Sequence, residues 1–289
     1  MTDAVTWRLR DRTLTFPPPV GAGIVNVTDD SFFSGARSGT PERAIEDGLA
    51  LVEAGFEMLD VGAVAARSGP PVPAEVETAK LAPAIAGLAA RSGVPVLADT
   101  FSVEVAAAVL DAGAAGINDI SGGGPEMFEL VAERGCGYVL MHIEGPPRVD
   151  REAPAYDDVV DHMKRWFAER IEAAQAAGVD AEQISIDPGL DFDLNTDHNL
   201  EILRRVDELR DLGRPIFMAL SRKDFLGAVL AGSWEERLPA EERGAVTQAA
   251  TALSAAAGVE IFRLHDREAL DAMRVAAAIA DPAAVPADA

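Results

Sequence analysis

The sequence predicts an α/β protein, a (β/α)8 TIM barrel with a short N-terminal hairpin. Eight β-branched or apolar runs bounded by glycine, proline or aspartate alternate with segments whose apolar residues recur every three or four positions. This alternation is typical of a parallel sheet covered by helices. Polar residues stand at or just after the carboxyl ends of the runs. In a barrel these ends meet on one rim, where active sites lie, whereas a doubly wound open sheet, the alternative, would spread them along an edge.

The elements follow one another without an interruption that would divide the chain. An opening segment at residues 6–16 predicts a hairpin that turns near Asp11. Barrel strands are predicted at residues 21–27, 57–63, 94–99, 115–120, 137–142, 183–187, 215–220 and 259–264. Helical spacing is clearest at residues 42–54, 103–112, 159–177 and 198–212. Because no linker or repeat intervenes, we expect a single domain over residues 1–289, with a frayed tail after residue 280.

Composition and charge exclude several functional classes. A formal charge of −23 argues against nucleic-acid binding, which requires a basic surface to neutralise phosphates. No apolar run is long enough to span a membrane, and the N-terminus lacks the features of a signal peptide, so a cytoplasmic location is expected. The single cysteine, Cys136, excludes an intramolecular disulfide and is expected to be a buried small hydrophobe.

Polar residues stand at or just after the strand ends and are expected to converge on one rim of the barrel. They are Asn26, Asp60, Asp99, Asn118, His142, Asp187, Lys223, Arg263 and His265. Arg263 and His265 alternate along the last strand, so their side chains point the same way. Asn26 ends the first barrel strand, which lies beside the last strand when a barrel closes. We therefore expect these three residues to cradle a diphosphate, where barrels commonly hold phosphate.

Some of these residues have a structural interpretation as well. Asp187 and Asn118, taken singly, could cap the helices that follow their strands. His142 could support a site or be a satisfied core residue, and the sequence leaves both open. Three further polar residues are expected to face solvent: Glu144, His162 and His198.

Seven short motifs occur in one order over residues 21–266. They are NVTDDSF (26–32), ADT (98–100), NDISGG (118–123), LMH (140–142), DPGLDF (187–192), SRK (221–223) and RLHD (263–266). No motif is specific alone. The ordered series, with each motif at a strand end, resembles the signatures of the dihydropteroate synthase family of the folate pathway.

The resemblance implies a transferase that condenses 6-hydroxymethyl-7,8-dihydropterin diphosphate with p-aminobenzoate or a related arylamine and releases pyrophosphate. It assigns pterin recognition to Asp187, Asn118 and Lys223. The edge of such a flat heterocycle carries amide and amino groups, and a carboxylate, an amide and a cationic donor can form hydrogen bonds with them. By the same resemblance Asp99 lies near the ring and stabilises the cationic pterin, and Phe192 keeps a substrate-binding position.

The resemblance also implies a cofactor and an assembly. Mg²⁺ is the expected cofactor, contacted by Asn26, and it neutralises the departing pyrophosphate together with Arg263 and His265. Arg67 is implied to help hold p-aminobenzoate. The residues expected to contribute to catalysis are Asp99, Lys223, Arg263 and His265. Family members are often dimers, so a homodimer is expected, with small molecules as the other partners.

The part of the site that holds p-aminobenzoate in the family is altered here. Three departures lie in the first loop, Asp29, Phe33 and Ser34, and two in the second, Ala66 and Ser68. Asp191 and Asp193 replace two glycines of the family, and Asp224 replaces a serine that in the family meets the p-aminobenzoate carboxylate. If Asp224 faces this part of the site as an anion, two unit charges ~6 Å apart at an effective dielectric of ~20 repel by roughly 3 kcal/mol, about a hundredfold in affinity, whereas a protonated or outward-turned Asp224 would remove this cost. The residues for pterin and diphosphate are intact.

Because of these departures, we also consider two other functions. One is a paralogue that binds pterin diphosphate but condenses it weakly or not at all with p-aminobenzoate. The other is a pterin-dependent methyltransferase that works with a corrinoid partner. Arg263 and His265 argue against the methyltransferase, because a methylfolate has no pyrophosphate to hold.

Overall fold

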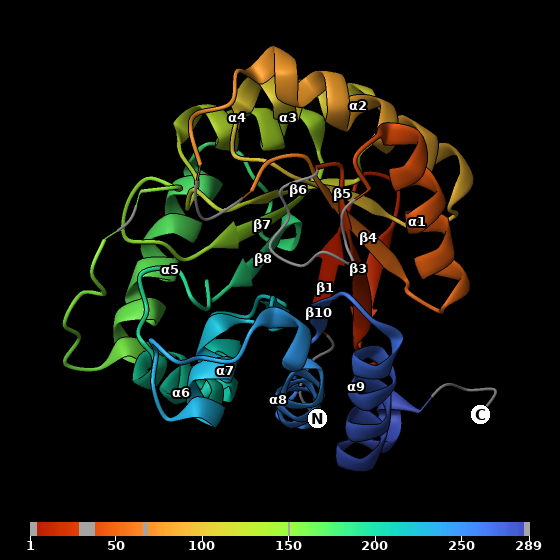
Figure 1. Ribbon diagram of the computed structural model, residues 1–289. Helices are drawn as coiled ribbons and strands as arrows, with labels where there is room; N and C mark the ends of the chain where they lie inside the picture. Colours follow the sequence, from red (N-terminus) through yellow and green to blue (C-terminus); the bar gives the residue numbers. More distant parts are fainter. Residues whose placement is uncertain (1–4, 29–37, 66–68, 150, 286–289) are drawn as a thin grey trace.

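Eight parallel strands surrounded by helices form the centre of the computed structural model, which describes residues 5–28, 38–65, 69–149 and 151–285 (Figure 1). The strands are β3 (Val20–Asn26), β4 (Met58–Gly62), β5 (Val96–Asp99), β6 (Gly116–Asp119), β7 (Gly137–Met141), β8 (Ile184–Asp187), β9 (Phe217–Met218) and β10 (Ile261–Leu264). Their order in the sheet is β8-β7-β6-β5-β4-β3-β10-β9. All eight lie within the segments predicted as strands, except that β3 begins one residue earlier.

Two contacts decide between a barrel and an open sheet. The first and last barrel strands pair in parallel, with Leu264 opposite Gly23. At the other end of the sheet order, Ile186 of β8 forms a parallel bridge with Ile216, the residue before β9. The Ile186 amide donates to the Pro215 carbonyl at 3.0 Å. The sheet is therefore closed, and the predicted (β/α)8 barrel is confirmed.

Helices cover the outside of the barrel. They are α1 (Pro41–Glu53), α2 (Ala74–Arg91), α3 (Val103–Asp111), α4 (Pro125–Arg134), α5 (Val159–Ala176), α6 (Thr196–Arg204), α7 (Asp224–Ala231), α8 (Gly244–Ala256) and α9 (Arg267–Ala280). The periodic segment at residues 198–212 is not one helix, because a 3-10 helix over Val206–Leu212 follows α6. The strands carry apolar residues on both faces, and the outward-facing ones join the helices in the main core.

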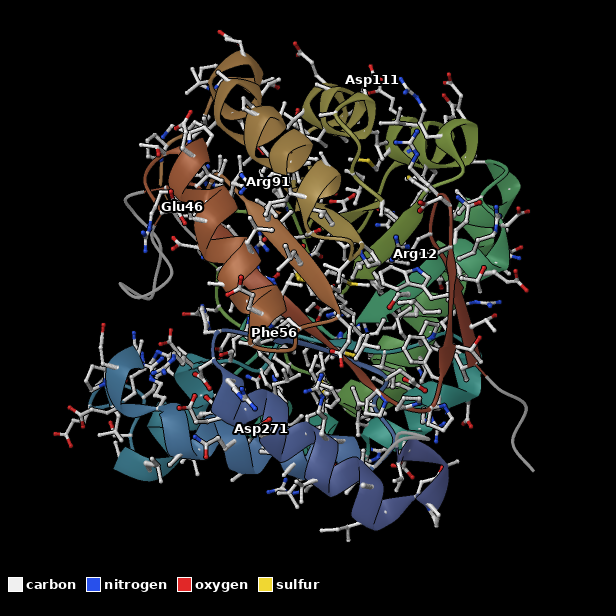
Figure 2. The ribbon with its side chains drawn as sticks, turned by 90° about the vertical axis from the view of Figure 1, so that its right-hand side faces the viewer. Arg12, Glu46, Phe56, Arg91, Asp111 and Asp271 are labelled. Carbon is white, nitrogen blue, oxygen red and sulfur yellow. The ribbon has the colours of Figure 1, made fainter. Side chains whose placement is uncertain are left out.

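The predicted hairpin closes the amino-terminal end of the barrel. It consists of β1 (Val5–Arg8) and β2 (Thr13–Phe16), paired antiparallel. Its Trp7 and Phe16 pack with inward-facing strand residues such as Met58, and the Trp7 indole Nε1 donates to the Gln183 carbonyl at 2.8 Å. Figure 2 shows the hairpin, marked by Arg12, at one end of the barrel and α1, marked by Glu46, toward the other. The barrel interior is thereby left accessible from the carboxyl rim.

Two smaller predictions can also be checked. Cys136 is fully buried, as expected, and burial raises the pKa of its thiol to about 12. In the described part of the chain, no helix combines the length and the apolar composition needed to cross a bilayer.

Candidate active site

A cavity of about 260 Å³ opens at the carboxyl rim. Of the nine residues proposed for the site, eight line it: Asn26, Asp99, Asn118, Asp187, Phe192, Lys223, Arg263 and His265. The ninth, Arg67, lies outside the described residues, as do the departures at positions 29, 33, 34, 66 and 68. Residues separated by up to 239 positions thus share one cavity because parallel strands all end at this rim.

Buried carboxylate and amide groups form the floor of the cavity. The Asp187 carboxylate Oδ1 accepts from the Gly189 amide at 2.8 Å, and the Asn118 amide donates to Asp60 Oδ2 at 3.1 Å. Neither side chain caps a helix, so that interpretation is wrong for both. The buried oxygens Asp60 Oδ1 and Asn118 Oδ1 have no partner among the described residues. Buried polar atoms of this kind are costly unless a ligand satisfies them.

Arg263 is held between two carboxylates rather than extended along the rim. Its Nε donates to Asp60 Oδ2, and its Nη2 donates to Asp99 Oδ2 at 2.9 Å. The position opposite Arg263 in β3 is Ala22, four residues before Asn26. The expected cradle with Asn26 is therefore corrected in one respect, because Arg263 starts deeper in the barrel and much of its charge is already paired.

Asp60 is the main site residue that the sequence analysis did not select. It was noted as a residue at a strand end, but it lies in the middle of β4 and is fully buried. Its carboxylate accepts from both Arg263 and Asn118 and so fixes the orientation of two cavity residues. Its role could have been predicted from the sequence MLDVG, because a charged residue within an apolar strand is rarely buried without a partner.

Burial alters the charge of the cavity carboxylates. It raises the pKa of Asp99 to about 7, although the Arg263 guanidinium acts in the opposite direction. Burial likewise raises the pKa of Asp187 to about 6. Asp99 therefore exchanges a proton near neutral pH, a property common among residues of functional sites.

We expect the Asp99 carboxyl to make the protein less stable as pH rises from about 4 to about 7. Its folded pKa lies above the ordinary value of 3.8, so in this interval the folded state holds a proton that the unfolded state releases. Asp99→Asn should flatten this part of the profile and stabilise the unliganded protein at pH 8 by about 1–3 kcal/mol. Denaturant unfolding at pH 5 and 8 measures this, with exposed Asp207→Asn as the control. Equal profiles for parent and Asp99→Asn would contradict it.

His265 is a neutral residue that lines the cavity together with Arg263. Its Nδ1 lies 2.7 Å from the Ser221 hydroxyl, and burial together with Arg263, Arg222 and Lys223 lowers its pKa to about 3. In the unliganded protein His265 is therefore uncharged near neutral pH. It can offer a hydrogen bond from Nε2 when Ser221 donates to Nδ1.

Lys223 supplies a cation beside an aromatic ring. Its Nζ donates to the Leu190 carbonyl at 2.7 Å and lies 4.8 Å from the centroid of the Phe192 ring. Lys223 is the residue before α7, so backbone and side chain both fix it at the rim. A positive group over an aromatic face is stabilised electrostatically.

The acidic residue at position 224 is ion-paired. Asp224 Oδ1 accepts from Arg243 Nη1 at 2.7 Å and lies 3.3 Å from Arg237 Nε. The hundredfold repulsion expected from an anionic Asp224 took no account of these two arginines, which offset its charge. Arg243 is itself buried, so Asp224→Ser would take a carboxylate away from a buried cation rather than simply remove a repulsive charge. Sequence reasoning missed Arg243 because it lies 19 residues further along the chain.

Histidines outside the cavity form a separate cluster. Glu144 Oε1 lies 3.2 Å from His142 Nε2 and 2.7 Å from His162 Nε2, and it accepts from the Tyr156 hydroxyl at 3.1 Å. These hydrogen bonds, His142 first, lower the pKa of Glu144 to about 2. Glu144 and His162 were expected to face solvent and are only partly exposed, at 22% and 34% of their side chains, because they contact each other. His142 is a buried residue of this cluster, and His198 is a partly exposed residue that caps α6 with Asn195.

The cluster of His142, Glu144 and His162 has the donor atoms for a metal ion, all within 4.8 Å of one another. Those atoms already satisfy one another through hydrogen bonds, and none of the three residues lines the main cavity. We therefore regard the cluster as a brace between the loop after β7 and α5.

The closed parallel barrel and its polar cavity at the carboxyl rim define a (β/α)8-barrel enzyme. Residues 22–265 match the family described as pterin binding enzyme. The dihydropteroate synthase of Mycobacterium leprae (strain TN) is 39% identical over 274 residues, which cover 92% of this chain and 95% of that protein. The structure of Xanthomonas albilineans dihydropteroate synthase with 4-aminobenzoic acid matches with a TM-score of 0.84 at 39% identity, covering 98% of this chain and 100% of that one. The chain belongs to the dihydropteroate synthase family of pterin-binding enzymes, as its motifs predicted.

A third relative bears on the alternative function. It is the inactive dihydropteroate synthase 2 of Mycobacterium leprae (strain TN), which is 40% identical over 250 residues. The matched residues cover 84% of this chain and 84% of that protein. Similarity of this degree therefore occurs with both active and inactive relatives, and the site residues must decide between them.

Proposed function

We propose that the protein catalyses the condensation of 6-hydroxymethyl-7,8-dihydropterin diphosphate with an arylamine of the p-aminobenzoate type, and releases pyrophosphate. The observation that carries the proposal is the cavity lining, which contains the Asp187 carboxylate and a buried Asn118 oxygen that has no partner among the described residues. These acceptors complement the amino and ring N–H groups of a pterin. Family membership supports the same reaction class.

Each wall of the cavity has a task in this reaction. Asp187 and Asn118 accept from the pterin edge, and Lys223 donates to its ring oxygen or nitrogen. Arg263 and His265 donate to the diphosphate as the bond between the pterin methylene carbon and the diphosphate oxygen breaks, with its electron pair leaving on oxygen. The arylamine nitrogen then forms the new C–N bond and loses a proton. Asp99, ionised above pH 7, stabilises the positive charge that develops on the pterin.

The wall around Asn26 suits a Mg²⁺ ion. Mg²⁺ prefers oxygen ligands and is usually held by one or two protein groups together with substrate phosphates and water. Asn26 and Thr28 both bring oxygen atoms to the cavity beside Arg263 and His265. Asn26, with Thr28, would hold the ion, which supplies charge neutralisation for the departing pyrophosphate.

The direct test is pyrophosphate release by the purified protein from pterin diphosphate, with and without p-aminobenzoate and with and without Mg²⁺. Release that depends on both supports the synthase. Tight pterin diphosphate binding without release would instead support the alternative, a binding paralogue, which the inactive relative favours.

We further propose that the chain acts as one pterin-binding domain in the cytoplasm, as a homodimer through α8 and α9. These helices pack side by side (Figure 1) and expose Leu253, Val275 and Ile279 at 74%, 60% and 81%. Exposed apolar side chains gathered on neighbouring helices are typical of protein interfaces.

Ile279→Asp is expected to convert a dimer into monomers, because it places a charge in the apolar centre of the proposed interface. Sedimentation or light scattering at micromolar concentration measures the mass. Val76→Asp on α2, another exposed apolar position, is the control and should leave the mass unchanged. A parent protein that is already monomeric would refute the interface.

A further inference from the structure

The cavity has a third wall that neither the pterin nor the diphosphate requires. Beyond the floor and the wall of Arg263 and His265, it is lined by Asp191, Phe192 and Asp224 beside Lys223. If the proposed function holds, the pterin and its diphosphate take the first two walls. The arylamine, and whatever group it carries opposite the amine, then faces the third.

The first turn of α7 belongs to this wall, and a carboxylate of the protein itself occupies it. The Asp224 amide donates to Asp191 Oδ2 at 2.5 Å, and the Phe225 amide donates to Asp191 Oδ1 at 3.2 Å. Amide groups at the start of a helix attract anions. Here both oxygens of one side-chain carboxylate already take that place.

The backbone holds Asp191 in this position. Its φ is 66°, in the left-handed region that a residue with a side chain seldom adopts. Its amide donates to Asn199 Oδ1 at 2.9 Å, and Asn199 is fully buried in α6. The side chain is buried as well, with the whole residue 5% exposed. Asp191 is therefore a fixed part of the wall.

We propose, on the basis of the proposed function, that Asp191 determines which arylamines the enzyme prefers. Its carboxylate occupies the start of α7. An arylamine with a carboxylate opposite its amine gains no contact with these amides, because Asp191 already takes them, whereas a neutral arylamine does not depend on them. The protein accordingly accepts neutral arylamines at least as well as p-aminobenzoate.

The chain contains a matched pair of positions for a test. Asp193 also adopts a left-handed φ, 54°, so glycine suits the backbone at both positions. The Asp193 carboxylate does not cap α7, because it accepts from the Glu144 amide at 3.0 Å and Arg151 at 2.6 Å. It does not line the main cavity. Asp191→Gly removes the carboxylate from α7, and Asp193→Gly makes the same chemical change outside the site.

The experiment measures KM and kcat for p-aminobenzoate and for its neutral analogue p-aminobenzamide. Asp191→Gly is expected to lower KM for p-aminobenzoate at least tenfold and to change KM for p-aminobenzamide less than twofold. Asp193→Gly should shift neither. Asp191→Asn, which keeps an acceptor at α7 without its charge, should give an intermediate gain. Equal shifts for the two amines, or no gain with p-aminobenzoate, would overturn the proposal.

A protein that releases no pyrophosphate with either amine would overturn the proposed function but still allow this test. Calorimetry then measures p-aminobenzoate and p-aminobenzamide binding in the presence of pterin diphosphate and Mg²⁺. The same selective gain for the anion in Asp191→Gly supports the inference, and equal affinities for parent and variant refute it. Thermal unfolding of each variant establishes that it is folded.

Discussion

Asp187→Asn is expected to lower the affinity for pterin diphosphate by about a hundredfold or more. The carboxylate can accept from two pterin donors, whereas the amide has one acceptor and turns an NH2 group toward the other. Leaving buried donors without acceptors costs roughly 1–3 kcal/mol each, and the two together reach that factor. The Gly189 amide, which donates to Asp187 Oδ1 in the parent, would also compete with the pterin for the single side-chain oxygen of the asparagine.

Calorimetry with pterin diphosphate and with the free pterin measures this effect. Both ligands should lose affinity equally, because the proposed function assigns Asp187 to the pterin edge and not to the diphosphate. Asp193→Asn, in the same loop and outside the cavity, is the control. In the parent, binding should also weaken below pH 6, since burial raises the pKa of Asp187 to about 6 and the protonated acid accepts less well. An Asp187→Asn protein that binds within threefold of the parent would contradict the assignment.

Arg263→Ala is expected to destabilise the fold by about 3–5 kcal/mol, because it removes the cation shared by Asp60 and Asp99. It should also weaken pyrophosphate binding more than binding of the free pterin. Asp60→Asn combined with Arg263→Ala removes one of the two orphaned charges, and should recover part of the lost stability. The two positions are in contact, so their effects will not add.

Denaturant unfolding of the parent, both single variants and the double variant gives the coupling between Asp60 and Arg263. Calorimetry with pyrophosphate and with pterin separates the two ligand effects. A double variant no more stable than Arg263→Ala would show that Asp60 does not need its counter-ion. Equal losses for pyrophosphate and pterin would contradict the assignment of Arg263 to the diphosphate wall.

The sequence by itself determined the barrel and eight of the residues that line its cavity. Strand length and period are local properties, and closure brings every carboxyl end to one rim, so eight of the candidates could be placed without coordinates. The ordered motifs predicted the family by their resemblance to its signatures, and the family match confirms this prediction.

Only the tertiary structure decided how these residues are charged and paired. Arg263 lies between Asp60 and Asp99 from two other strands, and Asp224 finds Arg243 from the start of α8. Such partners lie 19 to 203 positions apart, so no local pattern records them. The pKa of Asp99 and of His265 follows from burial and from charges on neighbouring strands. Sequence fixes which groups reach the rim, whereas the protonation and hydrogen bonding of those groups depend on distances that only the folded chain sets.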